Sequence, residues 1–384
     1  MADNGARLSS LDSLRGLIIV LMALDHARGF IARNHPSEFW GSPLPDYQGD
    51  GLAFVTRLVT HLCAPGFMFL MGVGASLFAA SRARAGWSPW RIAGHLALRG
   101  LVLVVIGQLF ENTAAAFGSA GATRAVTYGL RVPGEPAAVT VVLGVLYGLG
   151  SALAVAALLV RLRPWALVLL SGVCVLATHL LTPHSSQVGD PIHPLLSMLV
   201  VPGFASPLLT VYPTVPWLGP TLLGLAFGRL LEGDRDRLFR RGALAGVASL
   251  AVFVVLRAFG GVGSFQPVEA GWIGFLNVTK YPPSLTFLLL TLGANLVLLG
   301  ALELSGAARS KWLAPLRVYG SVPLFFFVTH LWLYAAMGRF FPAGMTIPRM
   351  YPFWLGGLVL LYLPCRWYGE FKRRRPAHSL LRLL

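Results

Sequence analysis

Apolar runs of about 20 residues recur along the whole sequence. A helix of about 20 residues crosses the roughly 30 Å hydrocarbon core of a bilayer. Only 12% of the residues are charged, against about 25% in a typical soluble domain. We therefore expect one integral membrane domain over residues 1–384, of the all-α class, built as a bundle of about ten transmembrane helices. The predicted spans are 13–33, 57–80, 93–112, 138–160, 165–183, 213–231, 242–259, 284–304, 319–341 and 350–369.

The basic residues gather in alternate loops between these spans, and the intervening loops contain few bases. The positive-inside rule places such basic loops in the cytoplasm. Both termini are then cytoplasmic, the helix count is even, and the basic tail over 370–384 contacts anionic membrane lipids. This pattern explains the net charge of +16 better than nucleic-acid binding does. The basic loops contain Arg82, Arg84 and Arg91; Arg161 and Arg163; Arg235, Arg237, Arg240 and Arg241; and Arg309, Lys311 and Arg317.

Several common kinds of site lack a sequence signal. The three cysteines, Cys63, Cys174 and Cys365, lie far apart in apolar runs and form no CxxC pair, so we interpret them as core residues. The chain has no GxSxG, Walker or HExxH motif. No two histidines have the i, i+4 spacing of a helical metal site, and we expect no metal cofactor.

The first apolar run carries polar residues near its middle, in LMALDHARGF at positions 21–30. Burying one charge in a bilayer costs about 2.5–3.5 kcal/mol on insertion scales, so Asp25, His26 and Arg28 are candidate functional residues. Eleven residues, about 16 Å of helix, separate Arg15 from His26. The resulting stripe predicts a path from the cytoplasmic face towards mid-membrane. Its members are Arg15, Met22, His26 and Arg33.

Two more histidines, His61 and His330, lie inside predicted spans, and Lys280 stands at the outer mouth of another. Each histidine taken singly could be structural, for example His61 bonding a carbonyl freed by Pro65. Three histidines on three helices, one beside Asp25, instead indicate proton transfer near neutral pH. The spacing of Gly72 and Ser76 predicts a closely packed helix pair.

The stretch RLSSLDSLRGLIIVLMALDHARGF is similar to the opening of the transmembrane acyltransferases related to heparan-α-glucosaminide N-acetyltransferase, and more closely to their bacterial relatives. The similarity continues through THLCAPGFMFLMGVGASL, VPWLGPTLLGLAFGRLL, FLNVTKYPPSLTFLLLTLGANL and VPLFFFVTHLWLY, over residues 7–335. The resemblance implies a membrane acetyltransferase, located in the inner (plasma) membrane of a bacterium. It would take acetyl-CoA from the cytoplasm as co-substrate and acylate a sugar amine or hydroxyl of an extracytoplasmic glycan or glycolipid.

The resemblance also implies roles for individual residues. In the lysosomal members an asparagine occupies the position of His26 and an aspartate that of His61, and the catalytic histidine lies near the place of His35. Either His26 or His35 is then the base. The expected catalytic residues are His26, Asp25, His61, His330 and His35, with Asp25 orienting His26. The expected cofactor-binding residues are Asp12 and Arg15, and the expected acceptor-binding residues are Arg28, Lys280 and Trp217.

Two other functions fit the same polar residues. A proton-coupled transporter or flippase could use an intramembrane Asp/His relay, although the sequence shows no inverted repeat of the kind common in transporters. A structural subunit could use the histidines to join helices. The acceptor, the acyl chain length, the choice between direct transfer and an acyl-enzyme, and a possible homodimer stay open.

Overall fold

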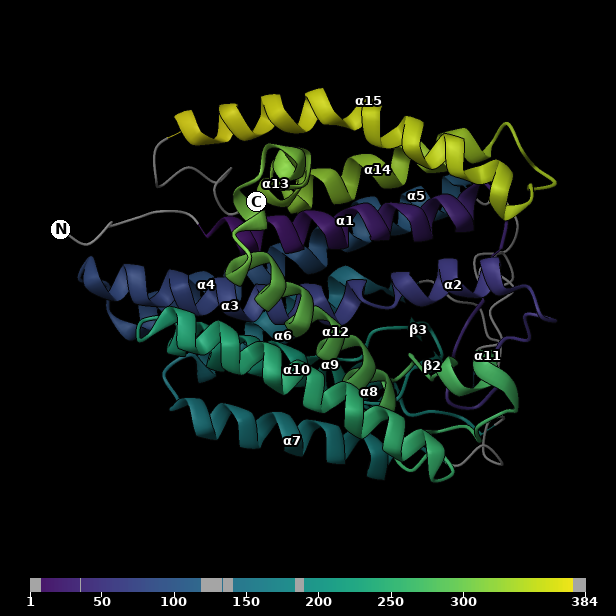
Figure 1. Ribbon diagram of the computed structural model, residues 1–384, viewed down its shortest axis with the longest axis horizontal. Coiled ribbons are helices and arrows are strands. Elements are labelled where there is room, and N and C mark those ends of the chain that lie inside the picture. The colour runs from purple at the N-terminus through teal and green to yellow at the C-terminus, as the bar shows by residue number, and fades with distance from the viewer. Residues whose placement is uncertain (1–7, 35, 119–132, 134–140, 184–189, 376–384) are drawn as a thin grey trace.

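Helices that run roughly along one common axis make up most of the protein (Figure 1). The computed structural model describes residues 8–34, 36–118, 133, 141–183 and 190–375. The first half contains α1 (Ser9–Phe30), α2 (Gly51–Thr60), α3 (Cys63–Arg84), α4 (Pro89–Ile106), α5 (Asn112–Gly118), α6 (Val145–Leu159) and α7 (Pro164–Leu181). The second half contains α8 (Pro194–Leu199), α9 (Thr214–Leu230), α10 (Arg235–Ala258), α11 (Gly271–Leu276), α12 (Leu285–Leu304), α13 (Ala314–Ser321), α14 (Pro323–Gly338) and α15 (Ile347–Arg374).

The predicted spans overlap these helices, with four local differences. The span expected over 138–160 is wrong at its start, because residues 141–143 form a β-strand and α6 begins at Val145. The run expected over 57–80 is interrupted after Thr60, where α2 gives way to α3. The run expected over 93–112 passes through a π-helical turn, Gly107–Glu111, into α5. The run expected over 319–341 is two helices, α13 and α14, bent by 87°. Pro323 begins α14, because proline has no amide hydrogen and suits the first turn of a helix.

A small β-sheet corrects the all-α prediction. Its strands are β1 (Val141–Leu143), β2 (Gly203–Ala205) and β3 (Leu208–Thr210), in the order β1-β3-β2, with β1 parallel and β2 antiparallel to β3. Strands of three residues are too short to show the alternation by which a strand is recognised. The fold is therefore mostly helical.

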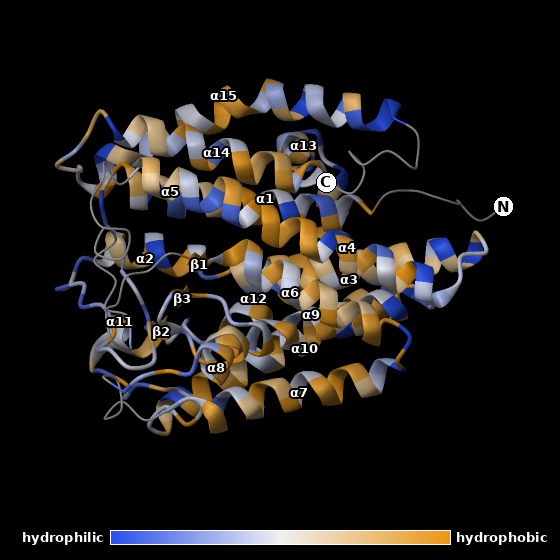
Figure 2. Cartoon of the chain, turned by 180° about the vertical axis from the view of Figure 1, so that it is seen from behind, coloured by the Kyte–Doolittle hydropathy of each residue, from blue (hydrophilic) through white to orange (hydrophobic). Residues whose placement is uncertain are grey.

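The outer faces of the bundle are apolar, as an integral membrane protein requires. Five helical segments of the described chain are long and apolar enough to cross a membrane, or six if the bent α13–α14 pair is one span. Leu180 on α7, Leu244 on α10 and Val359 on α15 are 73%, 68% and 74% exposed, and Figure 2 shows that hydrophobic residues predominate along α7. By this criterion α1 is not counted as a candidate span, because it contains too many charged residues, namely Asp12, Arg15, Asp25 and Arg28.

The two ends of the bundle differ. The start of α1, the α3–α4 turn and the end of α15 lie at one end, and the β-sheet and α11 lie at the other (Figures 1 and 2). The strongly hydrophilic helix ends of α3, α4 and α15 in Figure 2 lie at the first end, which we call the basic end. The assignment of this end to the cytoplasm stays a prediction. Residues 376–384 of the basic tail lie outside the described part.

Helices α3 and α9 approach closely through small residues, as the Gly72–Ser76 spacing predicted. A Cβ atom added at Gly72 would lie 2.1 Å from the Thr221 carbonyl oxygen, and one added at Gly224 would lie 1.9 Å from the Phe69 carbonyl oxygen. Backbone atoms cannot move aside as a flexible side chain can. This contact fixes α3 against α9 and so positions the residues of α3 that face the site described below.

Gly224→Ala is expected to destabilise the protein by about 1–3 kcal/mol, because the extra methyl overpacks the α3–α9 contact. Gly172→Ala on α7 is the matched control, since a Cβ there meets nothing within 4 Å. Alanine is the better helix former by about 1 kcal/mol, so the control is expected to be neutral or stabilising. Thermal unfolding of the two variants in detergent measures the difference. Equal melting temperatures would contradict the close approach.

Candidate active site

The ring nitrogens of His26 and His330 meet at the centre of the candidate site. His26 comes from α1 and His330 from α14, and the distance from His26 Nδ1 to His330 Nε2 is 2.7 Å. His330 is fully buried, and His26 is partly exposed. The other ring nitrogen of His330, Nδ1, lies 2.8 Å from the carbonyl oxygen of Phe326, one turn earlier on α14.

This arrangement fixes where the protons lie when both rings are neutral. The Phe326 carbonyl only accepts, so His330 Nδ1 must donate to it, and His330 Nε2 is then an acceptor. It follows that His26 Nδ1 donates to His330 and that His26 Nε2 carries the lone pair. Nε2 makes no hydrogen bond to any other described residue. His26 therefore presents a basic nitrogen that is free to take a proton.

Asp25 does not orient His26 in the predicted way. Consecutive residues on a helix do not face each other, and the Asp25 carboxylate points towards two arginines. Its oxygens lie 2.8 Å from Arg28 Nη2 and 2.9 and 3.0 Å from Arg57 Nη1. The partner that orients His26 is His330, and Asp25 belongs to a neighbouring network of buried ion pairs.

Arg57 on α2 joins this network to the loop that follows α1. Its guanidinium forms a two-pronged ion pair with Glu38, with 2.7 Å between Nε and Oε1 and a second bond from Nη2 to Oε2. The side chains of Arg57 and Glu38 are 1% and 0% exposed. Burial acts to raise the pKa of Glu38, but the charge and hydrogen bonds of Arg57 outweigh it and lower that pKa to about 2. Glu38 is therefore ionised at neutral pH.

The Glu38 backbone holds a second loop, the one before α12. The Glu38 carbonyl accepts hydrogen bonds from the amides of Lys280 and Tyr281, at 3.0 and 2.9 Å. The Phe39 and Tyr281 rings stack with their centroids 4.9 Å apart. The VTKYPPS stretch is thus tied to the network, and Lys280 lies next to it with a side chain that is 3% exposed.

His61 and Trp217 are two further predicted site residues, and both pack against the same aromatic ring. His61 follows α2 directly, and its Nε2 is 4.0 Å from Glu38 Oε1. Its ring and the Trp217 ring both contact Phe287, with centroid distances of 5.4 and 6.4 Å. Trp217 is fully buried, so it does not project from an open mouth.

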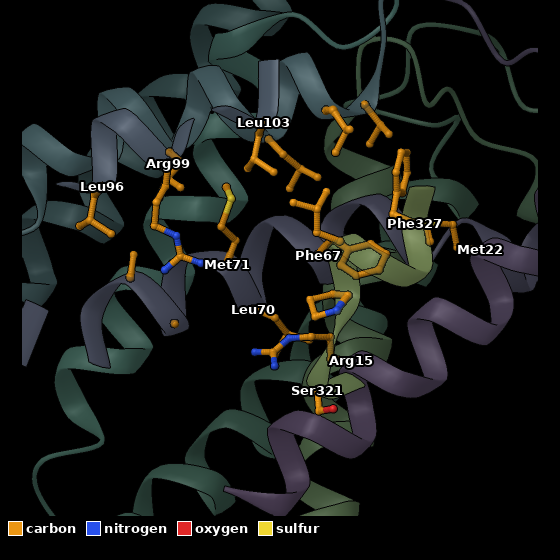
Figure 3. A pocket seen from close by; sticks show the side chains of 18 of the residues that line it. Arg15, Met22, Phe67, Leu70, Met71, Leu96, Arg99, Leu103, Ser321 and Phe327 are labelled. Atoms are coloured by element: carbon orange, nitrogen blue, oxygen red, sulfur yellow. The ribbon is translucent and has the colours of Figure 1, made fainter. Parts of the chain in front are cut away.

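A cavity of about 310 Å³ leads from the basic end towards the histidine pair. Figure 3 shows the Arg15 and Arg99 side chains on one side of it and Met22 and Phe327 on the other, with Phe67, Leu70, Met71 and Leu103 between them. Lys372 of α15 also lines it. The Phe327 ring lies 6.3 Å from the His26 ring and 5.7 Å from the His330 ring, centroid to centroid. The apolar walls of the cavity therefore end beside the histidine pair.

Two members of the predicted stripe, Arg15 and Met22, line this cavity. Asp12 forms an ion pair of 3.0 Å with Arg15, so it positions the base and does not itself enter the lining. His35 lies outside the described residues. Within the described part of the chain no group of three or more His, Cys, Asp and Glu side chains has the arrangement of a metal site.

Sequence reasoning missed Arg99 and Lys372 in the cavity and gave no site role to Arg57 or Glu38. Arg99 had a signal, because it is an arginine inside the apolar run of α4 and such charges normally face the inside of a bundle. Glu38 had no signal in the sequence, because a glutamate in a predicted loop gives no indication of whether its carboxylate is solvated or buried.

The fold and the site define a membrane protein whose apolar cavity connects a basic opening with a histidine base. A family model described as heparan-alpha-glucosaminide N-acetyltransferase, catalytic, matches residues 7–257. The chain belongs to this family, which is a family of acetyltransferases that use acetyl-CoA. The match includes His26, Asp25, Arg57 and Arg99 and ends before Lys280 and His330. No curated protein matches the chain.

Proposed function

We propose that this protein transfers an acyl group, with acetyl the expected one, from cytoplasmic acyl-CoA to a sugar amine or hydroxyl on the far side of the membrane. The observation that carries the proposal is the cavity, which has three bases around one part and the His26–His330 pair beside the other. Membership of an acetyltransferase family supports the same reaction class.

Arg15, Arg99 and Lys372 would bind the phosphates of CoA. Arginine pairs with phosphate through two parallel hydrogen bonds and lysine acts as a point charge. Arg15 and Arg99 both line the cavity, and like charges that share one cavity are better accommodated when an anion lies between them. The methionine and leucine walls suit the less polar arm that carries the thioester.

At the end of the cavity beside the histidine pair, His26 Nε2 would take the proton of the acceptor amine or hydroxyl while the acceptor attacks the thioester carbonyl. The carbon–sulfur bond then breaks, and the same proton passes from His26 to the CoA sulfur. The products are the acylated acceptor and CoA thiol, and no net proton is gained or lost. His330 accepts the hydrogen bond of His26 Nδ1 throughout, so Nε2 is the nitrogen that takes up and releases the proton.

Acetyl-CoA is expected to raise the melting temperature of the detergent-purified protein in a saturable way, since a ligand that binds only the folded state stabilises it. Arg99→Ala is expected to weaken that binding about tenfold or more, because a hydrogen bond to a charged group contributes about 1.5–3 kcal/mol. Arg91→Ala is the matched control, since Arg91 is exposed on the same helix and does not line the cavity.

The outcome of this titration decides the proposal. Binding that weakens in Arg15→Ala and Arg99→Ala, and not in Arg91→Ala, supports it. A well-folded protein that binds neither acetyl-CoA nor longer acyl-CoAs would rule it out.

A further inference from the structure

Lys280 is a buried cation without a counter-ion. Its side chain is 3% exposed, and among the described residues its Nζ atom makes no hydrogen bond or ion pair. Nζ instead makes a cation–π contact with the Tyr281 ring, whose centroid lies 5.0 Å away. A cation–π contact contributes about 0.5–2 kcal/mol, which is less than the several kcal/mol that burial of an unpaired ion costs.

The carboxylates nearby are already occupied. Asp25 is bound by Arg28 and Arg57, and Glu38 is bound by Arg57 through both oxygens. Three cations, Arg28, Arg57 and Lys280, therefore face two carboxylates. Counted over the described residues, the cluster carries a surplus positive charge, and Lys280 is the cation that none of their carboxylates neutralises.

This surplus charge lies beside the reaction centre. Lys280 interacts electrostatically with both His26 and His61. Two donors of Arg28, Nε and Nη1, and one ring nitrogen of His61, Nδ1, are also buried without a partner among the described residues. Buried donors without partners are rare in proteins, so these groups are available to bind a polar ligand.

We propose that the acyl acceptor carries an anionic group, a phosphate or a carboxylate, and that Lys280 binds this group while the acceptor amine or hydroxyl faces His26. This inference rests on the proposed acyl transfer and narrows its acceptor to an acidic sugar derivative. The fixed backbone of Lys280, whose amide donates to the Glu38 carbonyl at 3.0 Å, would hold the charge at a set distance from the base.

The test measures binding of glucosamine 6-phosphate to the purified protein by thermal shift, without any acyl-CoA. Glucosamine and inorganic phosphate, each at matched ionic strength, are the comparison ligands. The variants are Lys280→Met, Lys280→Arg and Lys311→Met, the last being a control because Lys311 is exposed. We expect wild type, Lys280→Arg and Lys311→Met to bind the sugar phosphate, and Lys280→Met to bind it at least tenfold more weakly.

The ligand-free melting temperatures give a second, independent result. An apolar residue in place of an unpaired buried ion is often neutral or stabilising, so Lys280→Met is expected to melt at or above the wild-type temperature. Sugar-phosphate binding that is unchanged in Lys280→Met, or glucosamine binding as tightly as its phosphate, would overturn the inference. A lower melting temperature for Lys280→Met would also overturn it, because the lysine would then be structural. If acetyl-CoA binds but the sugar phosphate does not, only this inference fails and the acyltransferase proposal stands.

Discussion

Replacing His26 with glutamine is expected to lower the rate of acyl transfer by about 10²–10⁴, the usual contribution of a general base. Glutamine keeps a hydrogen-bonding group near His330 but cannot take a proton from the acceptor. Binding of acetyl-CoA is expected to stay within about twofold of wild type, since His26 does not line the cavity that holds the cofactor arm. Transfer of labelled acetyl groups and the acetyl-CoA thermal shift measure the two quantities on one preparation.

His95→Gln is the matched control for this experiment. His95 lies on α4, stacked on Phe78 with 4.8 Å between ring centroids, and it contacts neither His26 nor His330 in the described structure. Its replacement is expected to leave the transfer rate unchanged. Transfer that persists in His26→Gln and disappears in His35→Gln would show that His35 is the base.

His330→Gln separates positioning from proton transfer. If His330 only sets the tautomer of His26, this variant loses less activity than His26→Gln and shifts the pH dependence of the rate. The His26/His330 double variant is then no slower than His26→Gln alone, because the two residues act as one unit. Additive losses would instead give His330 a chemical step of its own.

The sequence predicted the helices well and their interruptions poorly. Long apolar runs identify membrane helices because the bilayer requires about 20 residues for each span. The 87° bend at Pro323 and the break after Thr60 depend on which neighbours satisfy the freed backbone groups, and composition does not contain this information. The small sheet was missed for the related reason that three-residue strands have no readable period.

The site was predicted in part for the same physical reason. Charged residues in an apolar run cannot face lipid, so Asp25, His26 and His330 were located correctly inside the bundle. Their partners could not be predicted, because the pairing depends on how α1, α2 and α14 cross. The contact between His26 and His330 joins residues 304 positions apart, and the ion pair between Arg57 and Glu38 depends on a loop returning over α2.

Arg57→Met is expected to be the most destabilising substitution in the polar network, at about 3–5 kcal/mol, because removing one partner of a buried ion pair leaves a buried charge uncompensated. Glu38 loses its counter-ion in this variant, and Asp25 loses its bond to Arg57 and keeps the one to Arg28. Glu38→Gln is expected to cost less, since Arg57 still pairs with Asp25 at 2.9 Å. Thermal and denaturant unfolding in detergent measure the order of the two losses.

The double variant Arg57→Met/Glu38→Leu tests the cause of that loss. If the uncompensated Glu38 charge is responsible, removing it as well restores part of the stability, because apolar residues of similar size often replace a buried ion pair at little cost. Arg84→Met is the control, since the Arg84–Glu232 pair is equally short at 2.8 Å but its side chains are 70% and 52% exposed. An exposed pair contributes about 0–1 kcal/mol, so this control is expected to unfold near the wild-type temperature. A double variant less stable than Arg57→Met would mean that Glu38 stabilises the fold through its other contacts. The loop carrying Glu38 would then depend on the backbone bonds to Lys280 and Tyr281 more than on the ion pair.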